Sequence, residues 1–131
     1  MWEITEKVKD YFINPRNPGE IEDPDGKAEV ESPACGDLMR LTFRVDSEER
    51  IIEARFKAFG CTASIAAASA LTEMITGSTL NDAARITNED IAAYLGGLPS
   101  HKMHCAVLGQ EVLEKAIGWY RCAGVLSDKS A

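Results

Sequence analysis

Two neighbouring segments with alternating apolar and polar residues constrain this fold more than any other feature. Every second side chain is apolar in residues 38–45, and the same alternation recurs in residues 51–59. A period of two is typical of strands in a sheet with one buried and one solvated face. The polar link between them predicts an antiparallel hairpin, with Val45 opposite Ile52 and Leu38 opposite Phe59. The apolar face is expected to contain Met39, Leu41, Phe43 and Val45 from one strand and Ile52, Ala54, Phe56 and Ala58 from the other.

The remaining segments predict one more strand and several helices. A shorter alternation predicts a strand at residues 27–32. Helical spacing of apolar residues predicts helices at 2–13, 64–76, 79–84 and 87–95, and a final helix from Ser100 to about Cys122. Prolines and glycines separate these segments. We therefore expect one domain over residues 1–131, with a frayed tail after about residue 124.

Three cysteines lie far apart in the sequence but are expected to converge. Cys35 precedes the first hairpin strand and Cys61 follows the second, so the predicted register places both at the same end of the hairpin. Opposite positions in such a pair lie about 5 Å apart, a separation suited to a shared metal. Cys105 follows 44 residues after Cys61, and the chain has no CxxC pair. This spacing argues against a zinc ribbon or a ferredoxin-type knuckle.

Two further side chains complete a possible four-coordinate site. Asp37 stands beside Cys35, and His104 precedes Cys105. Three thiolates with one carboxylate or imidazole suit a soft metal, and the sequence leaves open whether Asp37 or His104 is the fourth ligand. Cys61 and Cys105 both lie at predicted helix N-termini, which lower thiol pKa values, so we expect both as thiolates near neutral pH.

Each of these residues taken singly has an ordinary structural explanation. Cys35 fits a small buried side chain, Asp37 a turn residue, Cys61 a tight connection, and His104 a capping or exposed histidine. The convergence of two cysteines by hairpin register favours the metal site over these separate explanations. Cys122, at the far end of the last helix, is expected to be a core residue or a bystander.

Composition narrows the classes of partner. The net charge is −7 in 131 residues, and no Lys/Arg cluster offers a stripe for nucleic acid. The longest apolar stretch is far too short to span a bilayer. The first six residues lack the basic segment and apolar core of a secretory signal, so we expect a cytoplasmic protein with reduced thiols.

At these residues the chain resembles the iron–sulfur cluster assembly scaffolds of the IscU type, whose fold also forms the N-terminal domain of NifU. The resemblance runs from about Thr5 to Cys122. It rests on Glu6-Lys7-Val8 leading to Asn14-Pro15-Arg16-Asn17, on Pro33-Ala34-Cys35-Gly36-Asp37, on Ala54-Arg55-Phe56-Lys57-Ala58-Phe59-Gly60-Cys61, and on Lys102-Met103-His104-Cys105. Thr62 departs from the glycine that family members commonly have after the second cysteine.

The resemblance implies an α+β fold of the SufE/NifU-like kind, with a three-stranded antiparallel sheet and helices packed on one face. It implies a non-enzymatic scaffold that holds a nascent 2Fe–2S cluster on Cys35, Cys61 and Cys105, with Asp37 or His104 as fourth ligand. A cysteine desulfurase of the IscS/NifS type would supply sulfur as a persulfide, and acceptor apo-proteins or carriers would receive the cluster. The same ligands would hold zinc in a protein purified in air, and a homodimer is compatible with this role.

Two other functions compete with the scaffold. One is a zinc-dependent sulfur relay of the related SufU type, which carries an insertion between the second and third cysteines that this chain lacks. The other is an enzyme with Cys105 as nucleophile and His104 as base. Adjacent residues on a helix do not face each other, which disfavours direct proton transfer between these two side chains. The scaffold is therefore the preferred interpretation.

Overall fold

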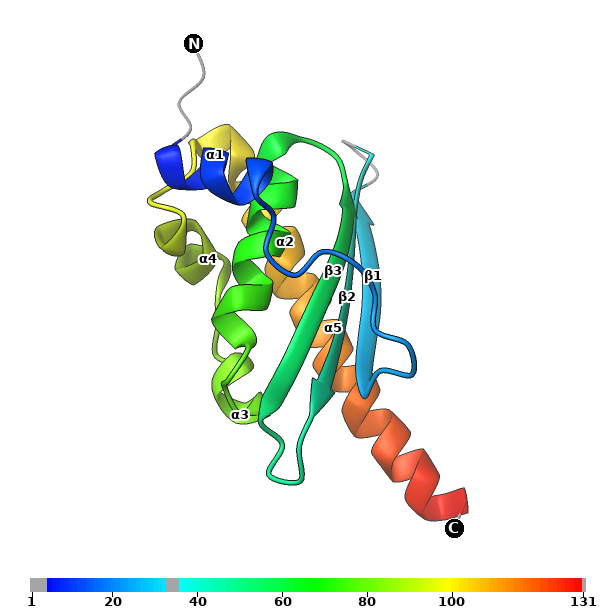
Figure 1. Ribbon diagram of the computed structural model, residues 1–131. Coiled ribbons are helices and arrows are strands. Elements are labelled where there is room, and N and C mark those ends of the chain that lie inside the picture. The colour runs from blue at the N-terminus through cyan, green and yellow to red at the C-terminus, as the bar shows by residue number, and fades with distance from the viewer. Residues whose placement is uncertain (1–4, 33–35, 131) are drawn as a thin grey trace.

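A three-stranded antiparallel sheet in the order β1-β2-β3 forms one layer of the molecule (Figure 1). The computed structural model describes residues 5–32 and 36–130. The strands are β1 (Gly26–Ser32), β2 (Asp37–Val45) and β3 (Ile51–Phe59). Leu38 pairs with Phe59, as the alternation predicted. The end of the hairpin that carries Asp37 therefore also carries the chain leaving β3.

A bulge shifts the register at the other end of the hairpin. Val45 pairs with Ile51, because the register changes between Arg44 and Val45. Ile51 is consequently fully buried, while Ile52 is 53% exposed. The expectation that Ile52 faces the core was wrong, since one extra residue in a strand turns the following side chains to the other face. Ala54 and Phe56 are on the buried face as predicted.

The helices cover one face of the sheet, which confirms the predicted fold class (Figure 1). Two of them, α2 (Thr62–Ile75) and α5 (Met103–Ser130), pack directly on the strands. The others are α1 (Glu6–Ile13), α3 (Leu80–Ala83), α4 (Asn88–Tyr94) and the short 3₁₀ turn η1 (Ser100–Lys102). Among the described residues, no helix combines the length and apolar character needed to cross a membrane.

Side-chain caps define where several helices begin. Thr5 caps α1 by accepting from Val8 N, and Thr87 forms a capping box with Asp90 at α4. The last helix continues to Ser130, past the end expected near Cys122. The sequence beyond Cys122 contains one glycine and no proline, and a single glycine costs only about 1 kcal/mol within a helix.

Small side chains on α2 let it lie close to its neighbours. Ala66, Ala67 and Ala70 are fully buried, and they belong to one core with Leu41 and Phe43 of β2. Because alanine has little side-chain volume, the axis of α2 approaches the sheet and α5 closely. The N-terminal ends of α2 and α5 therefore lie beside the same end of the sheet.

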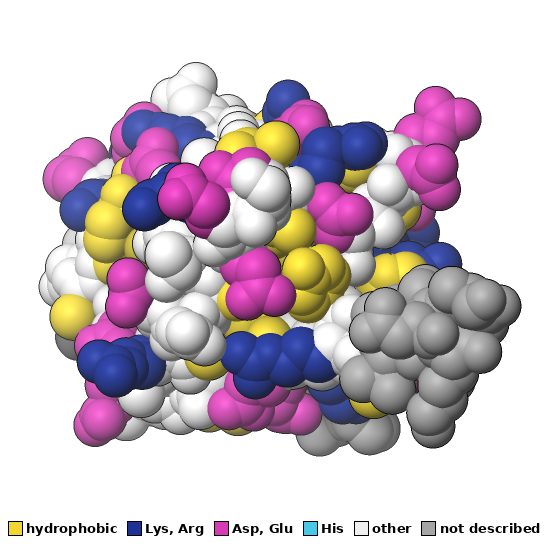
Figure 2. Space-filling model, turned by 90° about the horizontal axis from the view of Figure 1, so that it is seen from below, with side chains coloured by type: hydrophobic (Ala, Val, Ile, Leu, Met, Phe, Trp, Pro, Cys, Tyr) yellow, Lys and Arg dark blue, Asp and Glu magenta, His cyan; other side chains and the backbone are white. Residues whose placement is uncertain are grey.

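The opposite face of the sheet carries mixed charge and a covering segment. Residues 14–25 run from α1 past the edge of β3 and across this face (Figure 1), where Gly19 N donates to Phe56 O and Ile21 N to Thr42 Oγ1. Arg40 forms ion pairs with Glu20 and Glu29. Figure 2, which views the molecule from below, shows basic and acidic side chains interspersed at that end of the molecule as well.

Candidate metal centre

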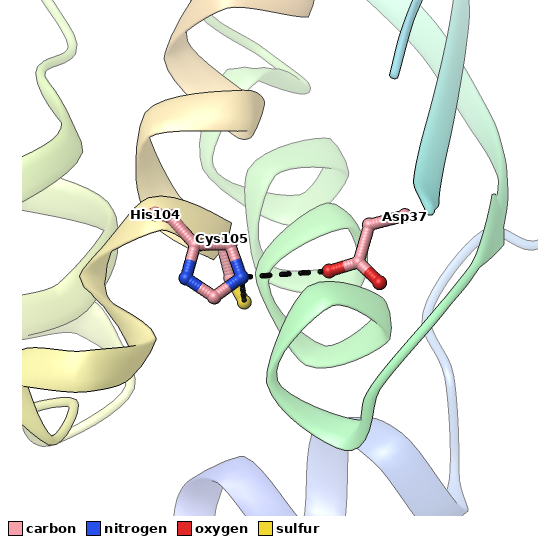
Figure 3. Close-up of side chains that lie close together, drawn as sticks. All are labelled: Asp37, His104 and Cys105. Atoms are coloured by element: carbon pink, nitrogen blue, oxygen red, sulfur yellow. Dashed lines mark hydrogen bonds and ion pairs between the residues drawn. The ribbon is translucent and has the colours of Figure 1, made fainter. Parts of the chain in front are cut away.

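Side chains from three elements meet at the end of the sheet where β2 begins and β3 ends. Asp37 is the first residue of β2, Cys61 is the N-cap of α2, and Cys105 lies in the first turn of α5. Figure 3 shows Asp37 pointing from its strand toward His104 and Cys105. The fold therefore gathers donors that are separated by many residues in the sequence. The hairpin register had predicted only that Cys35 and Cys61 lie at the same end, and the family resemblance implied that Cys105 joins them with Asp37 or His104.

The four donor atoms form a closed ring of short distances. The Sγ atoms of Cys61 and Cys105 are 3.5 Å apart. Cys105 Sγ lies 3.5 Å from His104 Nε2, so the expectation that these adjacent side chains do not meet was wrong. His104 Nε2 lies 3.6 Å from Asp37 Oδ2. The ring closes at 3.9 Å between Asp37 Oδ2 and Cys61 Sγ. Donor atoms around one tetrahedral zinc ion lie about 3.3–3.8 Å apart, given zinc bond lengths of about 2.0–2.3 Å.

Three of these donors lie close enough together to share one metal ion, and Cys61 lies beside them, 3.5 Å from Cys105 Sγ. Asp37, His104 and Cys105 each offer one ligand atom, and these atoms lie within 4.8 Å of one another. Sulfur, imidazole nitrogen and carboxylate oxygen are a donor set that zinc and iron accept. Cys35, the remaining predicted ligand, lies outside the described residues.

The inner side of the site is buried in the protein, and its outer side is open to solvent. Cys105 is fully buried and Asp37 is only 4% exposed. Cys61 is half-buried, and the side chain of His104 is 35% exposed. Phe59, at the end of β3, is 66% exposed beside Gly60 and Cys61 in the sequence. A bound metal would thus be anchored from inside and reachable from solvent through Cys61 and His104.

Gly60 leaves room for the carboxylate of Asp37. A Cβ atom at Gly60 would overlap Oδ1 of Asp37, and the φ angle of Gly60 is +151°. Both the space and the backbone angle therefore require glycine. Gly60 therefore allows the Asp37 side chain to occupy its place in the site.

Ser64 is part of the site, although the sequence analysis treated it only as the start of a helix. Its side chain is fully buried. The hydroxyl donates to Asp37 Oδ2 at 2.6 Å and lies 3.2 Å from Cys105 Sγ and 3.6 Å from Cys61 Sγ. Helix α2 begins two residues before the expected Ser64 because Cys61 takes the N-cap position. A polar residue three positions after a predicted ligand, on the same helical face, was the signal that could have identified it.

The two thiols differ in acidity, and one expectation was wrong. Burial raises the pKa of Cys61, but hydrogen bonding with Ser64 and Cys105 outweighs this effect and lowers the pKa overall. Burial raises the pKa of Cys105 to about 12. The prediction that both are thiolates near neutral pH therefore holds in direction for Cys61 and fails for Cys105, because loss of hydration outweighs the helix N-terminus.

Cys122 takes no part in this cluster of donors. Its side chain is exposed on α5. The helical rise separates it from Cys105 by about 25 Å. The prediction of a core residue was wrong, and the prediction of a bystander agrees with this position. Cys122 therefore provides a natural control for experiments on the other cysteines.

The fold and site define a class: an α+β protein with thiol, carboxylate and imidazole donors at one open end of a small antiparallel sheet. The model of the NifU-like N terminal domain family matches residues 3–125, and the chain belongs to this family. The chain is 54% identical over 128 residues to the nitrogen fixation protein NifU of Trichormus azollae, covering 92% of this chain and 43% of that protein. It spans about two fifths of the length of the NifU relatives it matches.

Shorter relatives are covered more fully. The iron–sulfur cluster assembly scaffold protein IscU of Aquifex aeolicus is 48% identical over 120 residues, covering 91% of this chain and 76% of that protein. IscU of Escherichia coli K12 is 42% identical over 120 residues, covering 89% and 93%. The crystal structure of a NifU-like N-terminal protein from Brucella abortus superimposes with a TM-score of 0.75 at 14% identity, covering 89% and 93%, and supports the fold.

Proposed function

We propose that this chain is a scaffold on which an iron–sulfur cluster is assembled and from which the cluster passes to acceptor proteins. The cluster is cargo, and the chain acts as a carrier and not as an enzyme. The cluster is of the 2Fe–2S type, held by Cys35, Cys61 and Cys105 together with Asp37 or His104. The relatives named as assembly scaffolds support this role, because the match with this chain covers 76% and 93% of their own lengths.

The observation that carries the proposal is the closed ring of donors. Two thiol sulfurs, a carboxylate oxygen and an imidazole nitrogen lie at successive distances of 3.5, 3.5, 3.6 and 3.9 Å. Cys35 precedes Asp37 by two residues in the sequence and supplies the third thiolate. No purely structural role requires four metal-binding side chains from β2, α2 and α5 to meet at one exposed end of a sheet.

The chemistry of the donors suits release as well as binding. Thiolates hold iron and sulfide firmly, whereas a carboxylate is a harder ligand that exchanges more readily. The exposed flank formed by Cys61 and His104 admits an incoming thiolate from an acceptor protein. A cysteine desulfurase is the partner on the supply side, and an external reductant must convert its persulfide sulfur to sulfide.

Anaerobic reconstitution tests this function. The reduced protein is incubated with ferrous iron, cysteine, a catalytic amount of cysteine desulfurase and dithiothreitol, and visible absorption is followed. We expect the red-brown absorption of a 2Fe–2S cluster in the parent and in Cys122→Ser, whose cysteine is exposed and far from the donors. We expect at least a tenfold loss of cluster in Cys35→Ser, Cys61→Ser and Cys105→Ser, because each loses a thiolate ligand.

The same experiment separates the scaffold from a zinc relay. A protein purified in air should contain about one zinc ion, because the donor set satisfies a tetrahedral site. A protein that keeps its zinc, accepts sulfur and never develops the cluster spectrum would act as a relay. Full reconstitution of all three cysteine variants would show that these cysteines are not the ligands.

A further inference from the structure

We infer that Ser64 is a positioning residue of the metal centre, whose hydroxyl holds the metal-facing carboxylate oxygen of Asp37 in place. This inference rests on the proposed function, because it concerns how the same donors are presented to a metal. Ser64 itself belongs to the α2 helix and is fully buried behind the donor ring. It does not face solvent, so its hydroxyl must find its partners within the site.

The hydrogen-bond geometry selects Asp37 as the partner of the Ser64 proton. A serine hydroxyl has one proton to donate. Asp37 Oδ2 lies at 2.6 Å, Cys105 Sγ at 3.2 Å and Cys61 Sγ at 3.6 Å from this hydroxyl. A carboxylate oxygen at this distance is the stronger acceptor, since hydrogen bonds to charged oxygen are shorter and stronger than those to sulfur. The Ser64 proton therefore points to Asp37, and the contact with Cys105 is secondary.

The oxygen that Ser64 holds is the one that faces the other donors. Oδ2 of Asp37 is the atom that lies 3.6 Å from His104 Nε2 and 3.9 Å from Cys61 Sγ. Oδ1 occupies the space that a side chain at Gly60 would need. Gly60 thus leaves room for one oxygen of the carboxylate, and the proton donated by Ser64 holds the other.

Loss of the hydroxyl should weaken metal binding through Asp37. Without Ser64 Oγ, the Asp37 carboxylate loses the hydrogen bond that sets its rotation. Oδ2 is then no longer held close to His104 Nε2 and Cys61 Sγ. Partners of ligating carboxylates contribute about 10- to 100-fold to metal affinity. Ser64→Ala removes only the hydroxyl and keeps a residue with high helix propensity, so α2 remains intact.

Zinc affinity of the reduced, metal-free protein measures this effect. The dissociation constant is obtained by competition with a chromophoric chelator under nitrogen. We expect Ser64→Ala to bind zinc about tenfold more weakly than the parent. Ser69→Ala is the matched control, because Ser69 is also fully buried on α2 but accepts a hydrogen bond from Arg16 N, away from the donors. Its zinc affinity should equal that of the parent.

A double-mutant cycle with Asp37→Ala separates positioning from a general packing defect. If Ser64 acts by holding Asp37, Ser64→Ala should change zinc affinity less than threefold once Asp37 is absent. The absorption spectrum of the cobalt(II)-substituted Ser64→Ala protein should shift toward that of Asp37→Ala, because both lose the carboxylate ligand. An equal tenfold loss in both backgrounds, or no loss in Ser64→Ala alone, would overturn the inference.

Zinc and cobalt(II) binding by the parent protein distinguishes a failure of this inference from a failure of the proposed function. A parent that binds neither zinc nor cobalt(II) would overturn the metal centre as a whole, and the role of Ser64 with it. A parent that binds both ions, while Ser64→Ala matches it in affinity and spectrum, would overturn only the role of Ser64.

Discussion

At the residue scale, the two thiols at the centre of the site differ in burial and in pKa. Cys61 is half-buried, and hydrogen bonding lowers its pKa against the opposing effect of burial. Cys105 is fully buried, and burial raises its pKa to about 12. Only a thiolate is a strong nucleophile toward sulfur or iron. We therefore expect Cys61 to be the thiol of this pair that reacts first in the metal-free protein, whereas a metal that binds Cys105 would have to displace its proton.

Alkylation across a pH series tests this difference. Iodoacetamide reacts with the thiolate, so the rate at each cysteine rises with pH up to its pKa. We expect Cys61 to reach its plateau at a lower pH than a cysteine in a model peptide, because its pKa is lowered. Cys105 should react slowly and still accelerate above pH 10, because its pKa is about 12. Peptide mapping by mass spectrometry resolves the two sites.

The measurement needs a check that the protein stays folded at each pH. Circular dichroism at each pH shows whether the apo-protein remains folded, and rates are compared only over that range. Equal pH profiles at Cys61 and Cys105 would contradict the assignment of Cys61 as the more acidic thiol.

At the element scale, the edge strand β1 depends on a glycine that lies under an aromatic ring. Gly26 pairs with Phe43, and a Cβ atom at Gly26 would overlap the ring of Phe43. Phe43 is fully buried in the core, so any movement of its ring must displace packed neighbours. The sequence alternation of β1 does not reveal this constraint, because it concerns volume and not polarity.

Replacement of Gly26 by alanine should destabilise the protein. We expect Gly26→Ala to lower the free energy of unfolding by about 1–3 kcal/mol, the usual cost of forcing an extra carbon into a packed core. Urea denaturation of the metal-free protein measures the change. Gly118→Ala is the control, because Gly118 lies within α5 with no atom near its added Cβ, and it should gain up to about 1 kcal/mol. Equal stability of Gly26→Ala and the parent would show that Phe43 and β1 adjust freely.

At the scale of the whole molecule, the donors that meet at this site come from the sheet and from both main helices. Asp37 comes from β2, Cys61 from the start of α2, and His104 and Cys105 from the start of α5. A ligand that binds the folded state more tightly than the unfolded state stabilises the fold. Metal binding is therefore expected to cross-link the sheet to both main helices.

Zinc should raise the thermal unfolding midpoint of the reduced protein. At a free zinc concentration of about 100 times the dissociation constant, the gain is about 2.7 kcal/mol. We expect an increase of several degrees in calorimetry, reversed by a chelator such as EDTA. Cys122→Ser should show the same increase, whereas Cys105→Ser should show little, because it loses a ligand. An equal increase in Cys105→Ser would mean that zinc stabilises the protein elsewhere.

Local patterns in the sequence determined a large part of this structure. The alternation in residues 38–45 and 51–59 determined the hairpin, since side-chain direction in a strand follows residue number. That register predicted that Cys35 and Cys61 lie at one end of the hairpin, and the family resemblance implied that Cys105 joins them with Asp37 or His104. Prolines and glycines predicted where several helices end, because they act on the backbone within a few residues.

Only the tertiary structure decided the features that depend on packing between distant segments. Ile51 and not Ile52 faces the core, because a bulge arises from the fit of the whole hairpin. Cys105 carries a raised pKa because neighbouring elements exclude water from it, which no local pattern reports. Ser64 meets Asp37 only because α2 crosses the end of the sheet at that point. Sequence periodicity describes one element at a time, whereas burial and contact across elements depend on how all of them share the same space.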